Sequence, residues 1–221
     1  VGYVILMYIS DCLIGNIPDT MGVIDADEEV RIQNLVFNNV FCKHSGTENL
    51  LYQEPDYPYV KLMLRLDTRE FLNVMSVTFG HPMCLPIHQI VIDILLHVMI
   101  EEGQDYTPLQ IGHLFTFLAR QKVVNSFYLD KKYLDQALDC LATNDVTGHE
   151  EREQALLELV LTIGITEFNE DRLLALSESA EFYQVCEVIY EKRNEYEKVL
   201  FCYWSNTSRV DKVFSYIYHI M

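Results

Sequence analysis

The chain has 221 residues, half of them apolar, with nine glycines and six prolines, which is ordinary for a folded protein. Its 33 Asp and Glu residues against 16 Lys and Arg give a formal net charge of −17. Nucleic acid and anionic lipid attract basic surfaces, so this charge argues against either one as a direct partner.

The cysteines and the ends of the chain bear on its compartment. Six cysteines are scattered without a C-x-x-C pair, which predicts free thiols in a cytosolic protein rather than a disulfide framework. The apolar run 1–9 is too short to cross a bilayer. A helical pattern is already under way at Val1 and continues to Met221. We therefore expect a fragment of a longer helical chain, with no direct membrane insertion.

The first part of the sequence predicts two helices followed by a loop. Turn signals and helical periodicity place the helices at 2–14 and 25–43. The predicted buried side of the second comprises Val30, Leu35 (or Asn34), Phe37 and Phe41. Residues 44–58 are rich in Gly, Asn, Pro and acids and predict a flexible loop.

Two capping boxes mark helix starts in the middle of the chain. Asp67 with Glu70, and Thr107 with Gln110, each pair an N-cap residue with a side chain that can reach back. The predicted helices here are 59–66, 67–79, 87–102 and 107–122. The third of them is apolar on nearly every side and predicts an inner helix. Its one polar stripe consists of Gln89, Asp93, His97 and Glu101. This stripe fits a proton relay or, more simply, the solvent-exposed edge of the helix.

A 13-residue offset organises the last part of the chain. Tyr183, Cys186 and Tyr190 recur as Tyr196, Val199 and Tyr203, each trio on one helical face. A helix of about 11 residues with a two-residue turn gives that offset and predicts αα-hairpins that must stack on one another. Helices are expected at 130–142, 150–163, 170–179, 180–193, 195–204 and 209–221. We therefore predict an all-α fold, an α-solenoid of stacked antiparallel helix hairpins with about 12 helices, as a single segment over 1–221.

The enzymatic motifs that we considered do not match. Phosphate-binding loops, the G-x-S-x-G elbow and Glu-x-x-His pairs are missing from the sequence. His149-Glu150-Glu151 begins like H-E-x-x-H, but Glu153 stands at the second histidine position. The set His81, Cys84 and His88 would lack a fourth zinc ligand at typical spacing and predicts a capped loop instead. We expect no catalytic, cofactor or metal residues.

Fourteen tyrosines are present, and several recur at matching hairpin positions. Core packing is the favoured interpretation, rather than an exposed surface for a partner, for Tyr183, Tyr190, Tyr196 and Tyr203. For Tyr216 and Tyr218, both alternatives stay open.

Three blocks carry a resemblance to known proteins: DTREFLNV at 67–74, LFTFLARQ at 114–121 and AEFYQVCE at 180–187. The segment 180–203 resembles a clathrin heavy-chain repeat, and the three blocks together resemble the solenoids of the vacuolar protein sorting family that builds the CORVET tether of early endosomes. The resemblance covers about 57–221, whereas residues 1–56 match only weakly.

The resemblance implies a long scaffold with an N-terminal β-propeller, an α-solenoid and a C-terminal zinc-binding RING. Its partners would be other subunits of the tethering complex, with Rab GTPase contacts outside this segment and a peripheral location on early endosomes. The expected function is therefore non-enzymatic: to space terminal modules and dock neighbouring subunits. Its rivals are a peptide-binding helical-repeat adaptor in vesicle traffic and an all-α enzyme.

Overall fold

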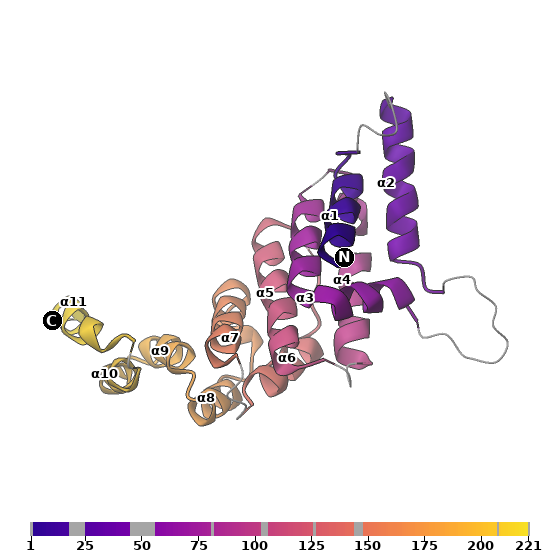
Figure 1. Cartoon of the computed structure of the whole chain (residues 1–221). Helices are drawn as coiled ribbons and strands as arrows, with labels where there is room; N and C mark the ends of the chain where they lie inside the picture. Colours follow the sequence, from indigo (N-terminus) through magenta and orange to yellow (C-terminus); the bar gives the residue numbers. More distant parts are fainter. Residues whose placement is uncertain are drawn as a thin grey trace. The chain divides into compact units, whose positions relative to one another are not determined.

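The computed structural model describes residues 2–17, 25–44, 56–80, 82–102, 106–125, 127–143, 148–206 and 208–220. In these ranges the chain forms eleven α-helices and no strand, which confirms the predicted all-α class (Figure 1). The chain divides into two compact units. The first comprises Val1–Tyr106 with Val124–Tyr128, and the second comprises Thr107–Val123 with Leu129–Met221.

The first unit is built on contacts of helix α1 (Gly2–Leu13) with α2 (Ala26–Val40) and α3 (Pro58–Phe79). A 3₁₀ segment η2 (Pro82–Ile87), helix α4 (His88–Leu96) and a π-helical turn η3 (His97–Glu101) follow. The core of the unit consists of apolar side chains with almost no exposure, among them Leu6, Leu13, Leu64, Phe71, Met75, Ile92, Leu95 and Met99. The predicted inner helix 87–102 therefore exists, although its last turn widens from α to π geometry.

Helix α3 contains a break at Asp67, whose backbone (φ −164°, ψ 100°) is extended rather than helical. The Asp67 carboxylate accepts a hydrogen bond from the Glu70 N–H at 2.9 Å, as an N-cap residue does. The two predicted helices 59–66 and 67–79 are thus the two arms of α3. If the two arms are counted separately, the described residues form 12 helices, in agreement with the expected number of about 12.

The buried side predicted for α2 is wrong in part. Val30 and Leu35 are 49% and 61% exposed, whereas Gln33 and Val40 are buried. Gln33 and Val40 are seven residues apart and share one face, but Leu35 lies about 200° around the helix from Gln33. Asn34, the alternative to Leu35, is also exposed, and its side-chain amide donates to the Val30 carbonyl at 2.9 Å. Of the predicted residues, Phe41 is buried and Phe37 is half-buried.

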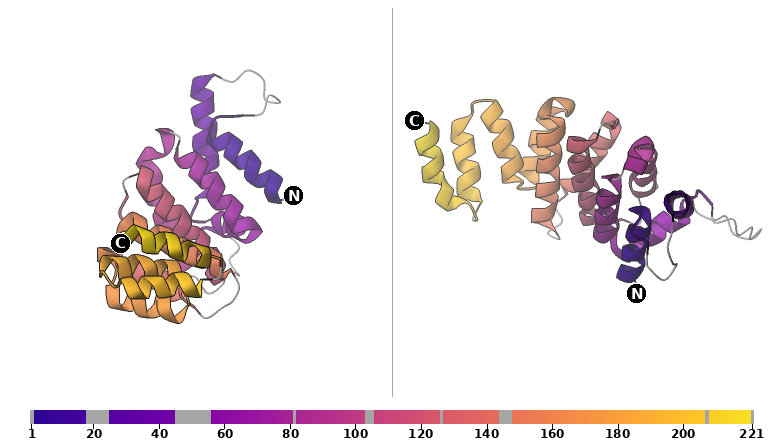
Figure 2. Two further views of the ribbon diagram at one scale, coloured as in Figure 1. Left: turned by 90° about the vertical axis from the view of Figure 1, so that its left-hand side faces the viewer. Right: turned by 90° about the horizontal axis from the view of Figure 1, so that it is seen from above.

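The second unit is a row of packed helices: α5 (Pro108–Val124), α6 (Lys131–Leu141), α7 (His149–Ile163), α8 (Glu170–Ser179), α9 (Tyr183–Lys192), α10 (Tyr196–Ser205) and α11 (Val213–Ile220). Helix α6 contacts α7 and α8, α9 contacts α7, α8 and α10, and α10 contacts α11. Figure 2 shows the later helices of this unit, α7 to α11 in orange and yellow, lying beside one another in chain order. The capping box predicted at α5 is complete, because the Thr107 hydroxyl accepts from Gln110 N–H and Gln110 Oε1 accepts from Thr107 N–H.

The 13-residue offset has a backbone origin. Helices α9 and α10 each have ten residues, and each follows a three-residue connection rather than the expected two. Glu181 and Asn194, 13 residues apart, both take a left-handed φ of nearly 60°. The next N–H in each turn reaches back to the carbonyl five residues earlier, Phe182 to Ser177 and Glu195 to Tyr190, which is a Schellman motif. The repeat in sequence is therefore a repeat of helix plus C-cap.

Some sequence-based expectations fall outside the described residues. Most of the predicted loop 44–58 does so, and its flexibility stays a prediction, as does the single segment over 1–221.

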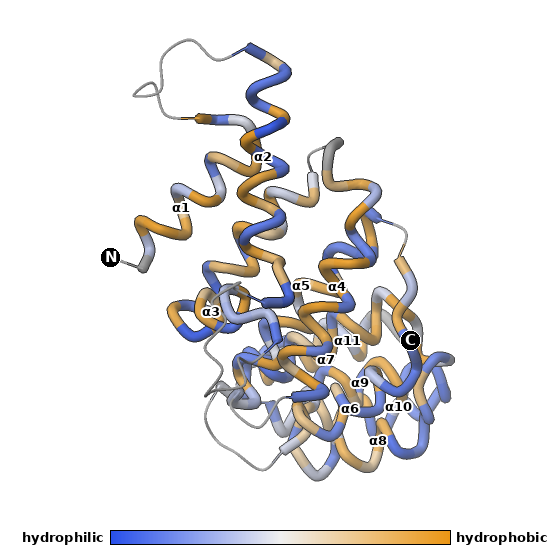
Figure 3. The backbone as a smooth tube through the Cα atoms, turned by 90° about the vertical axis from the view of Figure 1, so that its right-hand side faces the viewer, coloured by the Kyte–Doolittle hydropathy of each residue, from blue (hydrophilic) through white to orange (hydrophobic). Residues whose placement is uncertain are grey.

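One described stretch, Cys84–Glu101, is long and apolar enough by composition to cross a membrane, and half of it is buried. The tube in Figure 3 is coloured by hydropathy, and orange apolar residues recur along α1 and α4.

Candidate interaction surfaces

One face of α7 holds the ends of its neighbours. His149 Nε2 donates to the Ala180 carbonyl at 2.9 Å and so caps the end of α8. The buried carboxylate of Glu153 accepts from the Gln184 N–H at 2.7 Å in the first turn of α9. This is the incomplete H-E-x-x-H pattern of the sequence, and both of its outer residues serve here as helix caps. Residues 31 positions apart in the chain are joined by these bonds.

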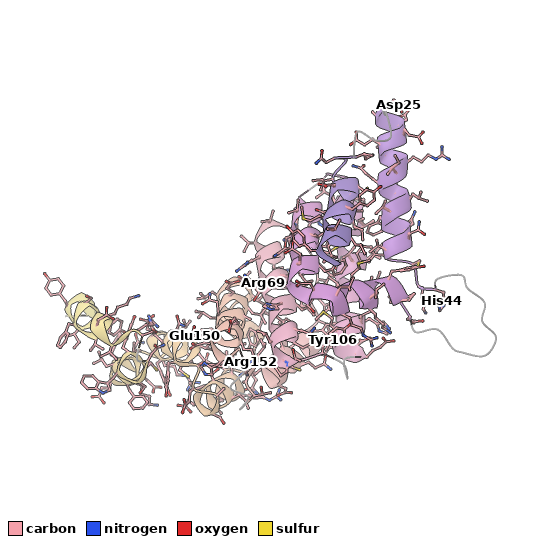
Figure 4. The ribbon with its side chains drawn as sticks, in the orientation of Figure 1. Asp25, His44, Arg69, Tyr106, Glu150 and Arg152 are labelled. Atoms are coloured by element: carbon pink, nitrogen blue, oxygen red, sulfur yellow. The ribbon has the colours of Figure 1, made fainter. Side chains whose placement is uncertain are left out.

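Arg152 lies between those two residues and is fully buried. Its guanidinium donates from Nη1 to the Leu141 carbonyl at 2.5 Å and to the Thr143 carbonyl at 3.0 Å, where α6 ends. It also lies 5.8 Å from the centre of the Phe182 ring, just before α9. Figure 4 labels Arg152 on α7. We call His149, Arg152 and Glu153 the capping face of α7, since it satisfies backbone groups of α6, α8 and α9 that helix ends leave unpaired.

Ion pairs join the same helices at their outer edges. Arg172 of α8 contacts Asp135 and Asp139 of α6. Glu170, at the start of α8, accepts from Lys192 at 2.6 Å and from Arg193 at 2.8 Å, at the end of α9. Hydrogen bonds from these two side chains lower the pKa of the Glu170 carboxyl. Acids thus lie at a helix N-terminus and bases at a C-terminus, where the helix dipoles favour each.

Buried tyrosines donate hydrogen bonds to glutamate carboxylates in the last four helices. The Tyr203 hydroxyl donates to Glu187 at 2.6 Å, and Arg209 forms a two-point ion pair with the same carboxylate. Burial first, and then Glu187, raise the pKa of Tyr203 to about 12. The Tyr190 hydroxyl donates to Glu178. Core packing is therefore confirmed for Tyr190 and Tyr203, and Tyr183 is half-buried.

The prediction that Tyr196 packs in the core is wrong, because its side chain is 45% exposed. Tyr183, at the matching position, hydrogen-bonds Ser205 of the next helix, whereas Tyr196 donates to Asn194 in its own turn. For Tyr216 and Tyr218, core packing and an exposed surface were both open, and the two residues differ. The Tyr216 ring centre lies 5.2 Å from that of Tyr203, with the two rings tilted by 35°, and Tyr216 is half-buried, whereas Tyr218 is 87% exposed.

Tyr218 belongs to a set of exposed aromatic side chains. Phe201 and Trp204 lie three residues apart on α10 and are 65% and 69% exposed. Phe214 lies four residues before Tyr218 on α11 and is 78% exposed. Such spacing places each pair on one helix face. We call these two pairs the aromatic ridges; the opposite faces carry the buried residues Val199, Cys202 and Val213.

The other candidate residues take structural positions where they are described. In the polar stripe of 87–102, Gln89 bonds Asp93 at 2.8 Å and the backbone of Tyr128, and His97 bonds Glu101 at 2.8 Å. Such contacts are typical of the solvent-exposed edge of a helix. His88 is buried and donates to the Phe79 carbonyl at 3.1 Å, and burial raises the pKa of Cys84 to about 11. His81 lies outside the described residues.

Comparison with known proteins identifies the relatives of the chain. Residues 1–79 match the family model described as Vps8 central TPR. The chain is 41% identical, over 227 aligned residues that cover 100% of it, to each of two proteins named vacuolar protein sorting-associated protein 8 homolog, one from Homo sapiens and one from Mus musculus. The chain belongs to the Vps8 family.

The Drosophila melanogaster Vps8 homolog is 30% identical over 98% of the chain. The chain spans 16% of the length of the human and mouse Vps8 homologs and 18% of the fly protein. No solved structure shows a significant match. The expectation that residues 1–56 match only weakly is wrong, because the Vps8 family model covers them.

Proposed function

We propose that this chain is a non-enzymatic helical scaffold of a vesicle-tethering assembly in vacuolar protein sorting, and that it docks neighbouring subunits. Two observations together carry the proposal. The sequence belongs to the Vps8 family, and polar side chains in the stack of helices hold the ends of neighbouring helices. His149, Arg152 and Glu153 would be expected to converge on a substrate if the chain were an enzyme. They bind backbone groups instead.

The aromatic ridges are the docking surface in this proposal. Tryptophan, tyrosine and phenylalanine are enriched in the parts of interfaces that contribute most binding energy, and large exposed apolar side chains mark such sites. The assembly would place the chain on the cytoplasmic side of early endosomes, held by its partner subunits rather than by its own insertion. Rab GTPase contacts would lie elsewhere in the longer protein.

The test measures binding between the full-length protein and the other purified subunits of the assembly. We expect the double variant Phe201→Ser/Trp204→Ser, and likewise Phe214→Ser/Tyr218→Ser, to weaken the affinity by at least about 30-fold, since the loss of even one side chain at such a site costs about 2 kcal/mol. Val123→Ser is the matched control, because Val123 is 74% exposed on α5. Unchanged affinity in both double variants, with an unchanged circular dichroism melt, would contradict the assignment of the ridges.

A further inference from the structure

Three side chains with metal-binding atoms converge in the first unit. Asp56, His97 and Glu102 each offer one ligand atom, and these atoms all lie within 4.8 Å of one another. Asp56 precedes α3, His97 begins the π-helical turn η3, and Glu102 directly follows it. The backbone N–H of Tyr57 donates to the Lys43 carbonyl at 2.9 Å, which holds Asp56 beside the end of α2. Figure 4 labels His44 at this end of α2.

The π-helical turn brings two of the three side chains together. The Glu102 N–H donates to the His97 carbonyl at 3.0 Å, a five-residue spacing. In a regular α-helix, residues five apart point about 140° away from each other. Here the wider turn leaves His97 Nε2 3.5 Å from Glu102 Oε1. Its Nδ1 is 2.8 Å from Glu101 Oε2.

The two ring nitrogens of His97 make contacts of different kinds. Because Nδ1–H donates to Glu101, a neutral His97 presents the lone pair of Nε2 toward Glu102. The 3.5 Å separation is long for an N–H···O hydrogen bond, whose usual length is about 2.9–3.0 Å. Two ligands of a tetrahedral zinc ion, each about 2.0–2.1 Å from the metal, are about 3.4 Å apart. A carboxylate behind a ligating histidine is also the usual arrangement at zinc sites.

The nearby lysines leave room for a cation. Lys61 pairs with Oε2 of Glu102, so that Oε1 faces His97. Lys43 Nζ lies 3.3 Å from Oδ2 of Asp56. The other oxygen of Asp56 is 3.9 Å from Nδ1 of His44, an exposed side chain.

We propose that Asp56, His97 and Glu102 bind one Zn²⁺ ion, with His44 able to supply a fourth ligand and Glu101 orienting His97. This departs from the expectation, drawn from sequence, that the chain carries no metal residues. The site joins the end of α2 and the start of α3 to η3, so the bound ion acts as a structural link. The proposal does not depend on the docking function proposed above.

The test is a calorimetric titration of the chain with Zn²⁺, paired with a Co²⁺ titration followed by absorption. We expect one equivalent of Zn²⁺ to bind, and Co²⁺ to give tetrahedral visible bands without the thiolate charge-transfer bands that cysteine ligands produce. His97→Ala and, independently, Asp56→Asn should each weaken zinc binding at least tenfold. Glu101→Gln should weaken it by about 10-fold to 100-fold, as loss of a supporting carboxylate does.

The matched control is His149→Gln, since His149 caps α8 and touches none of these residues. It should bind Zn²⁺ as the unmodified chain does. No binding at one equivalent would overturn the proposal, as would unchanged affinity in folded His97→Ala or Asp56→Asn protein. Thiolate bands in the cobalt spectrum would also overturn it, because they would assign the ion to cysteines. If His97→Ala does not fold, Asp56→Asn decides.

Discussion

Arg152→Met is expected to lower the free energy of unfolding by about 4 kcal/mol, a large part of the total for a domain of this size. The methionine keeps the apolar stem but removes the donors to the Leu141 and Thr143 carbonyls. Each carbonyl left without its donor costs about 1–3 kcal/mol, and the cation–π contact with the Phe182 ring is lost as well. Urea denaturation followed by circular dichroism measures the loss.

Arg172→Met is the matched control for this prediction. Arg172 also joins two helices, but its ion pairs with Asp135 and Asp139 are solvent-exposed, and such pairs contribute at most about 1 kcal/mol. The capping role of Arg152 would be refuted if the two variants lost stability equally, or if Arg152→Met lost less than about 1 kcal/mol.

Tyr190→Ala should cost on the order of 3 kcal/mol through the cavity that it leaves between α9 and its neighbours. Tyr190 is only 4% exposed, its hydroxyl donates to Glu178, and Lys198 lies 4.9 Å from its ring centre. Thermal and urea melts should both shift. Tyr190→Phe, which keeps the ring, should lose only about 1 kcal/mol, the usual contribution of one hydrogen bond.

The comparison variant for Tyr190 is Tyr196→Ala. Tyr196 is 45% exposed, so its removal should change stability by less than about 1 kcal/mol. Equal losses at the two positions, or an unchanged melt for Tyr190→Ala, would show that the ring does not fill the packed interior of the stack.

Local patterns in the sequence predict the helices well because helix formation depends on near neighbours. Asp67 and Thr107 cap helices where the capping boxes place them. The 13-residue repeat also follows from residues close in the chain, since each unit contains its own helix and C-cap. The left-handed turn residues Glu181 and Asn194 were harder to foresee, because the sequence has no glycine there to mark them.

Contacts between distant residues could not be predicted from periodicity. Glu153 reaches Gln184 across 31 positions, and nothing near Glu153 in the sequence indicates its burial. The same limit explains Leu35 and Tyr196: a helix pattern predicts an apolar face but does not say which neighbour covers it. At the proposed zinc site, α-helical periodicity groups His97 with Glu101, whereas the π-helical turn also brings Glu102 beside His97.

The central claim is that this chain docks other subunits of its assembly through α10 and α11. Cross-linking mass spectrometry of the intact assembly, with a lysine-reactive reagent, tests it most directly. Lys198 on α10 and Lys212 just before α11 lie in the two segments that carry the aromatic ridges. We predict cross-links from these lysines to a neighbouring subunit. Cross-links from them only to other residues of the same protein, in an assembly that is otherwise well cross-linked, would contradict the claim.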